Sequence, residues 1–109
     1  MGWLKNLLGG GAAVGRLSPA EAYEKAKAGA ILLDVRTPLE RQEGKIPGSL
    51  PLPLDRLASE WEKLPRNEEI ICQCRSGSRS ARAARFLASK VYNLVGGIES
   101  WKQQKLPVK

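Results

Sequence analysis

The chain of 109 residues is 42% hydrophobic and 27% charged, which is typical of one globular domain and not of a disordered chain. It has no histidine, which excludes Ser–His–Asp and Cys–His catalysis within the chain and any zinc site built on imidazole. Two cysteines are too few for a disulfide scaffold. The longest apolar runs are too short to span a membrane.

The net charge of +7 is confined to the last third of the sequence. Residues 1–73 carry 10 basic and 10 acidic side chains, whereas residues 74–109 carry 8 basic side chains and the single acid Glu99. Such an excess is typical of a nucleic-acid contact, a membrane-surface patch or a site for small anions. Because it begins at a cysteine, Cys74, we favour the site for small anions. The basic, aromatic strands of an RNA-reading sheet are absent, so nucleic acid is at most a second role.

Residues 1–15 are predicted to form a flexible, apolar and glycine-rich leader before a single domain at 16–109. The leader lacks a convincing secretory signal, and Asn6 stands where a myristoylation pattern needs Ser or Thr. Weak docking of residues 1–8 to a membrane or a partner is the open alternative. The missing signal favours a cytoplasmic protein.

The first half of the domain predicts a helix, a buried strand and a long connection. Ser18, Pro19 and Glu21 form a capped helix start, and the helix should end at Gly29. The apolar run 30–35 is typical of a strand covered on both faces. The prolines that follow, at 38, 47, 51 and 53, predict a loop with extended pieces. A short helix is then predicted at 55–63, ending before Pro65.

The second half continues the alternation of strands and helices. Residues 69–73 and 91–95 read as buried strands, and 78–89 and 98–103 as helices. Ala81, Ala84 and Ala88 form a small-residue face for packing on a sheet. Together the elements predict an α/β fold in three layers, with a central, mostly parallel sheet and helices on both faces.

The segment 74–80, Cys-Arg-Ser-Gly-Ser-Arg-Ser, lies between a buried strand and a helix, where parallel α/β sheets collect their functional residues. Gly77 permits a cup-shaped loop whose inward N–H groups, together with the helix N-terminus, stabilise an anion. Such a cup favours the Cys74 thiolate, with Arg75 and Arg79 adding positive charge. Guanidinium groups can also hold an anionic substrate at two oxygens. The loop therefore predicts Cys74 as a nucleophile activated without a histidine.

Other interpretations of these residues stay open. Cys74 could be an inert buried thiol beside solvated arginines. Cys72, inside the strand, is predicted to be a core residue; a Cys72–Cys74 disulfide would lie near the outer geometric limit for a bridge. Arg82 and Arg85 follow Arg79 at a helical spacing of three. A solvated helix face is favoured for them, and an extension of the positive field of the loop is the alternative.

Three segments together resemble the single-domain rhodanese family, the thiosulfate sulfurtransferase-type proteins. Residues 74–79 resemble its six-residue active-site loop. Leu33-Asp-Val-Arg36, with Glu40, Gly44 and 46–48 after it, resembles the upstream signature. Residues 93–98, with Trp101 and Leu106-Pro107, resemble the closing segment. The resemblance covers residues 16–107.

The resemblance implies a rhodanese-like fold and a ping-pong sulfur transfer without metal or cofactor. Cys74 would take the outer sulfur of thiosulfate as a persulfide and pass it to cyanide, a thiol or a protein acceptor. A sulfur-relay or regulatory binding module with little thiosulfate turnover is the alternative. Arg36 is expected to shape the surroundings of the loop and Asp34 to be a structural partner. Glu40 and Glu43 could face the pocket, but solvated loop carboxylates are the favoured interpretation. The residues expected to hold substrate or persulfide are Arg75, Ser76, Gly77, Ser78, Arg79, Ser80 and Arg36.

Two departures from the family pattern concern the region beneath the loop. Lys45 stands where the family commonly has histidine, and Arg41 where it has an aromatic residue. Loop length separates the chain from the related cysteine phosphatases and arsenate reductases. Their loop has five residues between cysteine and arginine, whereas Cys74 and Arg79 enclose four. The tighter cup favours a single sulfur atom over a phosphate.

Overall fold

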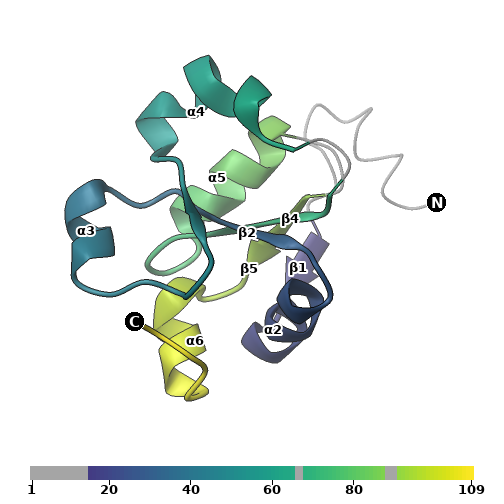
Figure 1. Cartoon of the computed structure of the whole chain (residues 1–109), viewed down its shortest axis with the longest axis vertical. Helices are drawn as coiled ribbons and strands as arrows, with labels where there is room; N and C mark the ends of the chain where they lie inside the picture. The colour runs from purple at the N-terminus through teal and green to yellow at the C-terminus, as the bar shows by residue number, and fades with distance from the viewer. Residues whose placement is uncertain (1–14, 66–67, 88–90) are drawn as a thin grey trace.

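The computed structural model describes residues 15–65, 68–87 and 91–109, which form a five-stranded parallel sheet in the order β1-β5-β4-β2-β3 (Figure 1). The strands are β1 (Gly15–Leu17), β2 (Ile31–Asp34), β3 (Leu50–Pro51), β4 (Ile70–Gln73) and β5 (Val91–Leu94). The helices are α2 (Pro19–Lys27), α3 (Pro38–Gln42), α4 (Leu54–Glu60), α5 (Ser78–Leu87), α6 (Gly97–Gln103) and the 3-10 helix η1 (Trp61–Lys63).

Helices cover both faces of the sheet, as the three-layer prediction requires: α4 and α5 lie on one side and α2 and α6 on the other (Figure 1). Successive residues of a strand point to opposite faces, so Leu33 and Cys72 pack in the core under α4 and α5. Leu32 and Ile71 pack in the second core with Trp101 of α6. The predicted α/β architecture is confirmed. None of the described helices is long and apolar enough to cross a membrane.

Two elements were not predicted. The prolines around position 38 predicted a loop, but Pro38–Gln42 is helix α3, with Thr37 as N-cap. The Thr37 side chain accepts from the Glu40 N–H, and the Glu40 carboxylate accepts from the Thr37 N–H. This capping box and a proline at the first helical position outweigh the helix-breaking effect of proline. The second element is β1, whose three residues pair with β5 from Tyr92 to Leu94.

The packing face of α5 also differs from the prediction. Ser80, Ala83 and Ala84 are buried, whereas Ala81 is only half-buried. Ala88 lies outside the described residues, as does the predicted leader apart from Gly15. The helix is therefore rotated so that Ser80 faces the sheet beside Cys74, which brings a hydroxyl group into the candidate site.

Candidate active site

Cys74 lies where the sequence predicted it, directly after β4 and at the start of the loop that leads into α5. Its Sγ accepts hydrogen bonds from the backbone N–H groups of Gly77 at 3.0 Å and Ser80 at 3.4 Å. The Ser80 hydroxyl lies 3.3 Å from the same sulfur. The residue is almost fully covered, with 1% of its surface exposed. The loop is therefore a cup of donors around one sulfur atom, as the glycine and the helix start predicted.

Backbone contacts fix the shape of this cup. Gly77 has a φ of +106°, a conformation that residues with a side chain rarely adopt. On the outer side, the first N–H groups of α6 hold the loop carbonyls: Ile98 donates to Cys74 at 2.8 Å and Glu99 to Arg75 at 3.2 Å. Gly97 stands so close that a Cβ there would lie 2.5 Å from the Cys74 and Arg75 carbonyl oxygens. The start of α6, with Gly97 in close contact, thus supports the loop directly.

The surroundings separate the two cysteines chemically. Burial alone would raise the pKa of the Cys74 thiol, but hydrogen bonds from the Ser80 hydroxyl and from the backbone of Ser80, Gly77 and Ser76 outweigh it and lower that pKa. Burial, with a smaller effect of the neighbouring Cys74 charge, raises the pKa of Cys72 to about 12. Both cysteines are free. Cys74 is therefore the more acidic thiol of the pair, and Cys72 is a core residue as predicted.

A residue that the sequence analysis missed, Asn93 of β5, stands behind the loop. The Ser80 hydroxyl lies 2.6 Å from Asn93 Oδ1 and 3.2 Å from the Gly77 carbonyl. All of these groups are buried. A hydroxyl has one proton, so Ser80 donates to only one of its acceptors at a time. Asn93 is a polar residue in an otherwise largely apolar strand, and that break in the pattern was the available signal.

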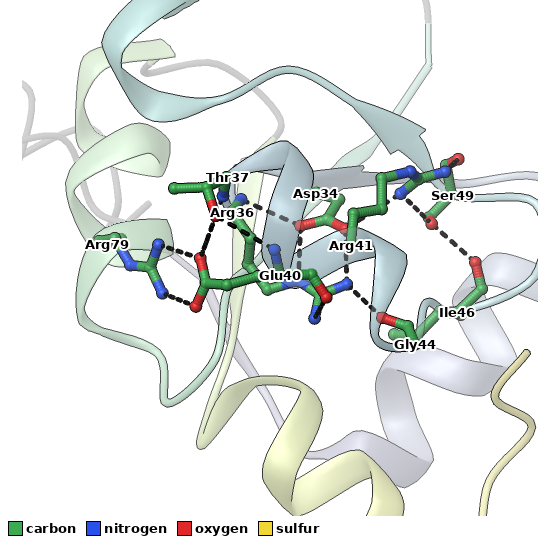
Figure 2. Close-up of polar contacts among 9 residues, drawn as sticks. All are labelled: Asp34, Arg36, Thr37, Glu40, Arg41, Gly44, Ile46, Ser49 and Arg79. Atoms are coloured by element: carbon green, nitrogen blue, oxygen red, sulfur yellow. Dashed lines mark hydrogen bonds and ion pairs between the residues drawn. The ribbon is translucent and has the colours of Figure 1, made fainter.

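Both loop arginines are paired with carboxylates. The guanidinium of Arg79 donates to the two oxygens of Glu40 at 2.7 and 2.8 Å (Figure 2). This pairing lowers the pKa of Glu40 to about 2 and raises that of Arg79. The exposed Arg75 donates to Glu99 at 2.9 Å. The expectation that Glu40 is solvated is wrong, because α3 carries it to the loop.

Beneath α3, Asp34 joins two arginines in a buried cluster (Figure 2). Arg36 donates to both oxygens of Asp34 at 2.9 Å and to the Gly44 carbonyl at 2.7 Å. Arg41 donates to Asp34 at 3.0 Å and to the Ser49 hydroxyl at 2.9 Å. Burial would raise the pKa of Asp34, but these bonds outweigh it and lower it. Arg36 is thus held by Asp34 and the Gly44 carbonyl, and none of its hydrogen bonds in the described structure goes to the Cys74 sulfur.

The structure brings together most of the residues predicted for the site. Gly77 and Ser80 contact the sulfur, Ser76 adds a backbone hydrogen bond, and the exposed Ser78 begins α5. Within residues 15–65, 68–87 and 91–109, no group of three or more acidic or cysteine side chains is arranged to hold a metal ion.

The fold and the site define an α/β domain in which a loop after a parallel strand holds one cysteine among N–H donors. Comparison with known proteins identifies the family. The chain matches the rhodanese-like domain over residues 18–104. A sulfurtransferase of Allochromatium vinosum is 37% identical over 82 residues, which are 72% of this chain and 77% of that protein. A thiosulfate sulfurtransferase of Ectopseudomonas mendocina is 35% identical over 91 residues, 80% of this chain and 84% of that protein.

A solved structure agrees with these relatives. The crystal structure of a rhodanese-related protein from Thermoplasma volcanium has a TM-score of 0.82 and 35% sequence identity with this chain. The match covers 87% of this chain and 97% of that one. The chain therefore belongs to the rhodanese-like family of sulfurtransferases.

Proposed function

We propose that this chain transfers sulfane sulfur from thiosulfate, or from a persulfide donor, through a persulfide on Cys74 to a thiol or cyanide. The Cys74 thiolate attacks the outer sulfur of thiosulfate, the S–S bond of the donor breaks, and sulfite leaves with the electron pair. An acceptor thiolate or cyanide then attacks the outer sulfur of the persulfide. The bond to Cys74 breaks, its electron pair returns to Cys74 as thiolate, and the acceptor carries the sulfur away.

The observation that carries this proposal is the set of hydrogen bonds to Cys74 Sγ. Two backbone N–H groups and one hydroxyl lie within 3.4 Å of the sulfur, and the pKa of Cys74 is lowered despite its burial. The thiolate is the nucleophilic form of cysteine, so these donors supply the activation that histidine provides elsewhere. The same donors suit a persulfide, which also carries negative charge. Because the chemistry needs a reduced thiol, we place it in a reducing compartment such as the cytoplasm.

The test is the intact mass of the protein before and after thiosulfate, with sulfite measured in parallel. We expect a gain of one sulfur atom and an equal amount of sulfite. Cys74→Ala should abolish both, whereas Cys72→Ala, which leaves the loop donors in place, should retain both. An unchanged mass, or a gain that persists in Cys74→Ala, would contradict the proposal.

A second candidate is a sulfur-relay module that accepts sulfur from a protein persulfide and turns over thiosulfate poorly. The pairing of the loop arginines favours it: Arg79 is bonded to Glu40 and Arg75 to Glu99. Neither guanidinium is then fully available for the sulfonate oxygens of thiosulfate. The two candidates differ in the donor. Faster loading of Cys74 by thiosulfate than by a small persulfide, such as cysteine persulfide, would contradict the relay.

A further inference from the structure

A cavity outside the Cys74 loop is lined almost entirely by cations and prolines. Its volume is about 600 Å³, within the range of small-molecule sites. Besides Gln42 and three prolines, its lining consists of Arg36, Arg41, Lys45, Arg56 and Lys109, and no acidic side chain among the described residues lines it. We call it the cationic cavity.

The cations of this cavity are only partly neutralised. Arg36 and Arg41 share the single carboxylate of Asp34, which leaves one positive charge between them. Arg56 donates through Nε and Nη2 to Glu60, so Nη1 is not used by that pair. In the part of the chain that the structure describes, the Lys45 ammonium has no carboxylate side chain within ion-pair distance.

The cationic cavity adjoins a second cavity that contacts the Cys74 loop at Arg79. A second cavity, also of about 600 Å³, shares Pro38, Pro53 and Arg56 with it. The rest of the second cavity is lined by Val35, Thr37, Leu54, Arg79, Arg82 and one acidic residue, Asp55. Val35 belongs to the same buried cluster as Cys74. A ligand with its charged body in the cationic cavity could therefore extend along these shared walls toward the loop.

We infer that the cationic cavity binds the anionic body of the sulfur acceptor, and that the acceptor is a small thiol carrying phosphate or carboxylate groups. This inference rests on the proposed function. The acceptor thiolate attacks the outer sulfur of the Cys74 persulfide, a new S–S bond forms on the acceptor, and Cys74 leaves as thiolate, so no further oxidant or reductant is needed. A thiol of this kind gains charge-assisted hydrogen bonds that a neutral thiol cannot make.

The test compares thiols that differ only in charge. Cys74 is first loaded with sulfur from thiosulfate, and the loss of that sulfur to an added thiol is then followed by intact mass. One pair of probes is 4′-phosphopantetheine and pantetheine, which differ by one phosphate. The other is glutathione and its diethyl ester, which differ in two carboxylates. In at least one pair we expect half-maximal transfer at an about tenfold lower concentration of the anionic member, the effect of one or two charge-assisted contacts. The pair that shows the difference identifies the anionic group.

Two double variants assign the effect to the cavity. Lys45→Gln with Arg56→Gln should remove the preference for the anionic thiol. Lys27→Gln with Arg85→Gln lowers the net charge equally on exposed positions outside the cavity and should retain it. Equal transfer to both members of both pairs would overturn the inference while leaving the persulfide chemistry intact. If oligouridylate inhibits sulfur transfer to the anionic thiol more strongly than inorganic pyrophosphate does, the cavity would be assigned to nucleic acid. That result would also overturn the inference.

The inference and the proposed function fail in different ways. If thiosulfate loads no sulfur on Cys74, the proposed donor chemistry is wrong. Calorimetric titration of the unloaded protein with phosphopantetheine and pantetheine, and with glutathione and its ester, then tests whether the cavity binds the anionic part of a thiol. Tighter binding of an anionic member, lost in the Lys45/Arg56 variant, supports the cavity, and equal binding within both pairs contradicts it.

Discussion

Arg79 and Glu40 lie 39 positions apart in the chain, and their side chains form two parallel hydrogen bonds of 2.7 and 2.8 Å. The pair ties α3, whose capping box also uses Glu40, to the first turn of α5 behind Cys74. Arg79 has five N–H donors, and Glu40 accepts two of them. Glu40 therefore fixes the direction in which the remaining donors of Arg79 point.

Glu40→Gln should destabilise the protein by about 1 kcal/mol, since the variant keeps an acceptor for Arg79 and a residue suited to the capping box but loses the charge. Loading of Cys74 from thiosulfate should become slower because Arg79 is less firmly placed. Urea unfolding measures the first effect and sulfite release the second. Glu24→Gln is the control, because its partner Lys27 forms an exposed pair within one helix. A variant as stable as the wild type would show that the pair contributes nothing.

The stabilisation from Glu40 should depend on pH in a defined direction. Pairing with Arg79 lowers the pKa of Glu40 from 4.5 to about 2. The folded protein therefore favours the ionised form of Glu40 more than the unfolded chain does. The contribution is then fully present above the unfolded value and is lost as the pH falls through the folded value. The difference in unfolding free energy between wild type and Glu40→Gln should shrink as the pH falls from about 4.5 toward 2. A difference that grows in this range would contradict the assignment.

Ser80→Ala should raise the pKa of Cys74, because it removes the side-chain hydrogen bond that most lowers that pKa. Alkylation of Cys74 by iodoacetamide near neutral pH should become about tenfold slower, the lower end of the range expected for one hydrogen bond to a charged group. At high pH, where both proteins are thiolate, the rates should converge. The exposed Ser59, replaced by alanine, is the control. Equal rates for wild type and variant across the whole pH range would contradict the role of the hydroxyl.

The sequence predicted the structure of the Cys74 loop well and the residues that surround the loop poorly. A cysteine after an apolar strand, a glycine and a helix start are neighbours in the chain, and their geometry follows from local backbone rules. Glu40 and Asn93 come from other elements, and although each stands in a segment that resembles the family, neither segment shows that its side chain lies near Cys74. They meet at the loop only because α3 and β5 pack beside it. Sequence reasoning therefore located the cysteine and its loop but not the contacts that Glu40 and Asn93 make with it.

The helix α3 shows a different reason for a missed prediction. Thr37-Pro38 and Glu40 repeat the arrangement of Ser18-Pro19 and Glu21, which correctly predicted α2. The nearby prolines favoured a loop, although proline at the first helical position does not break a helix. The strand β1 had no comparable signal, since its three residues are strand only through pairing with β5. The capping motif of α3 could therefore have been recognised from the sequence. The pairing of β1 with β5 could not.

Native alkylation should distinguish the two cysteines. The pKa of Cys72 is raised to about 12, whereas that of Cys74 is lowered by the loop donors. Iodoacetamide at mildly alkaline pH should therefore add one label, on Cys74, and a second label should follow only after unfolding in urea. Peptide mass spectrometry locates the labels, and Cys74→Ser should take up none while folded. A label on Cys72 in the folded protein would contradict the assignment of that residue to the core.

Gly97→Ala should disrupt the loop by a close contact that Gly48→Ala does not create. Both glycines have a positive φ, +63° and +81°, so alanine carries a similar backbone penalty of about 1 kcal/mol at each position. A Cβ at Gly97 would lie 2.5 Å from the carbonyl oxygens of Cys74 and Arg75, whereas nothing lies within 4 Å of a Cβ at Gly48. The loop or α6 must therefore move in Gly97→Ala, and the donors around Cys74 Sγ move with it.

We expect Gly48→Ala to lose about 1 kcal/mol of unfolding free energy and to load Cys74 with sulfur at the wild-type rate. Gly97→Ala should lose about 3 kcal/mol or more, the range of severe packing and strain defects, and its folded fraction should load sulfur more slowly. Urea unfolding and the mass gain after thiosulfate measure the two effects on the same samples. Equal behaviour of the two variants would mean that α6 does not support the loop. A loss of stability with normal loading in Gly97→Ala would separate the fold from the geometry of the sulfur site.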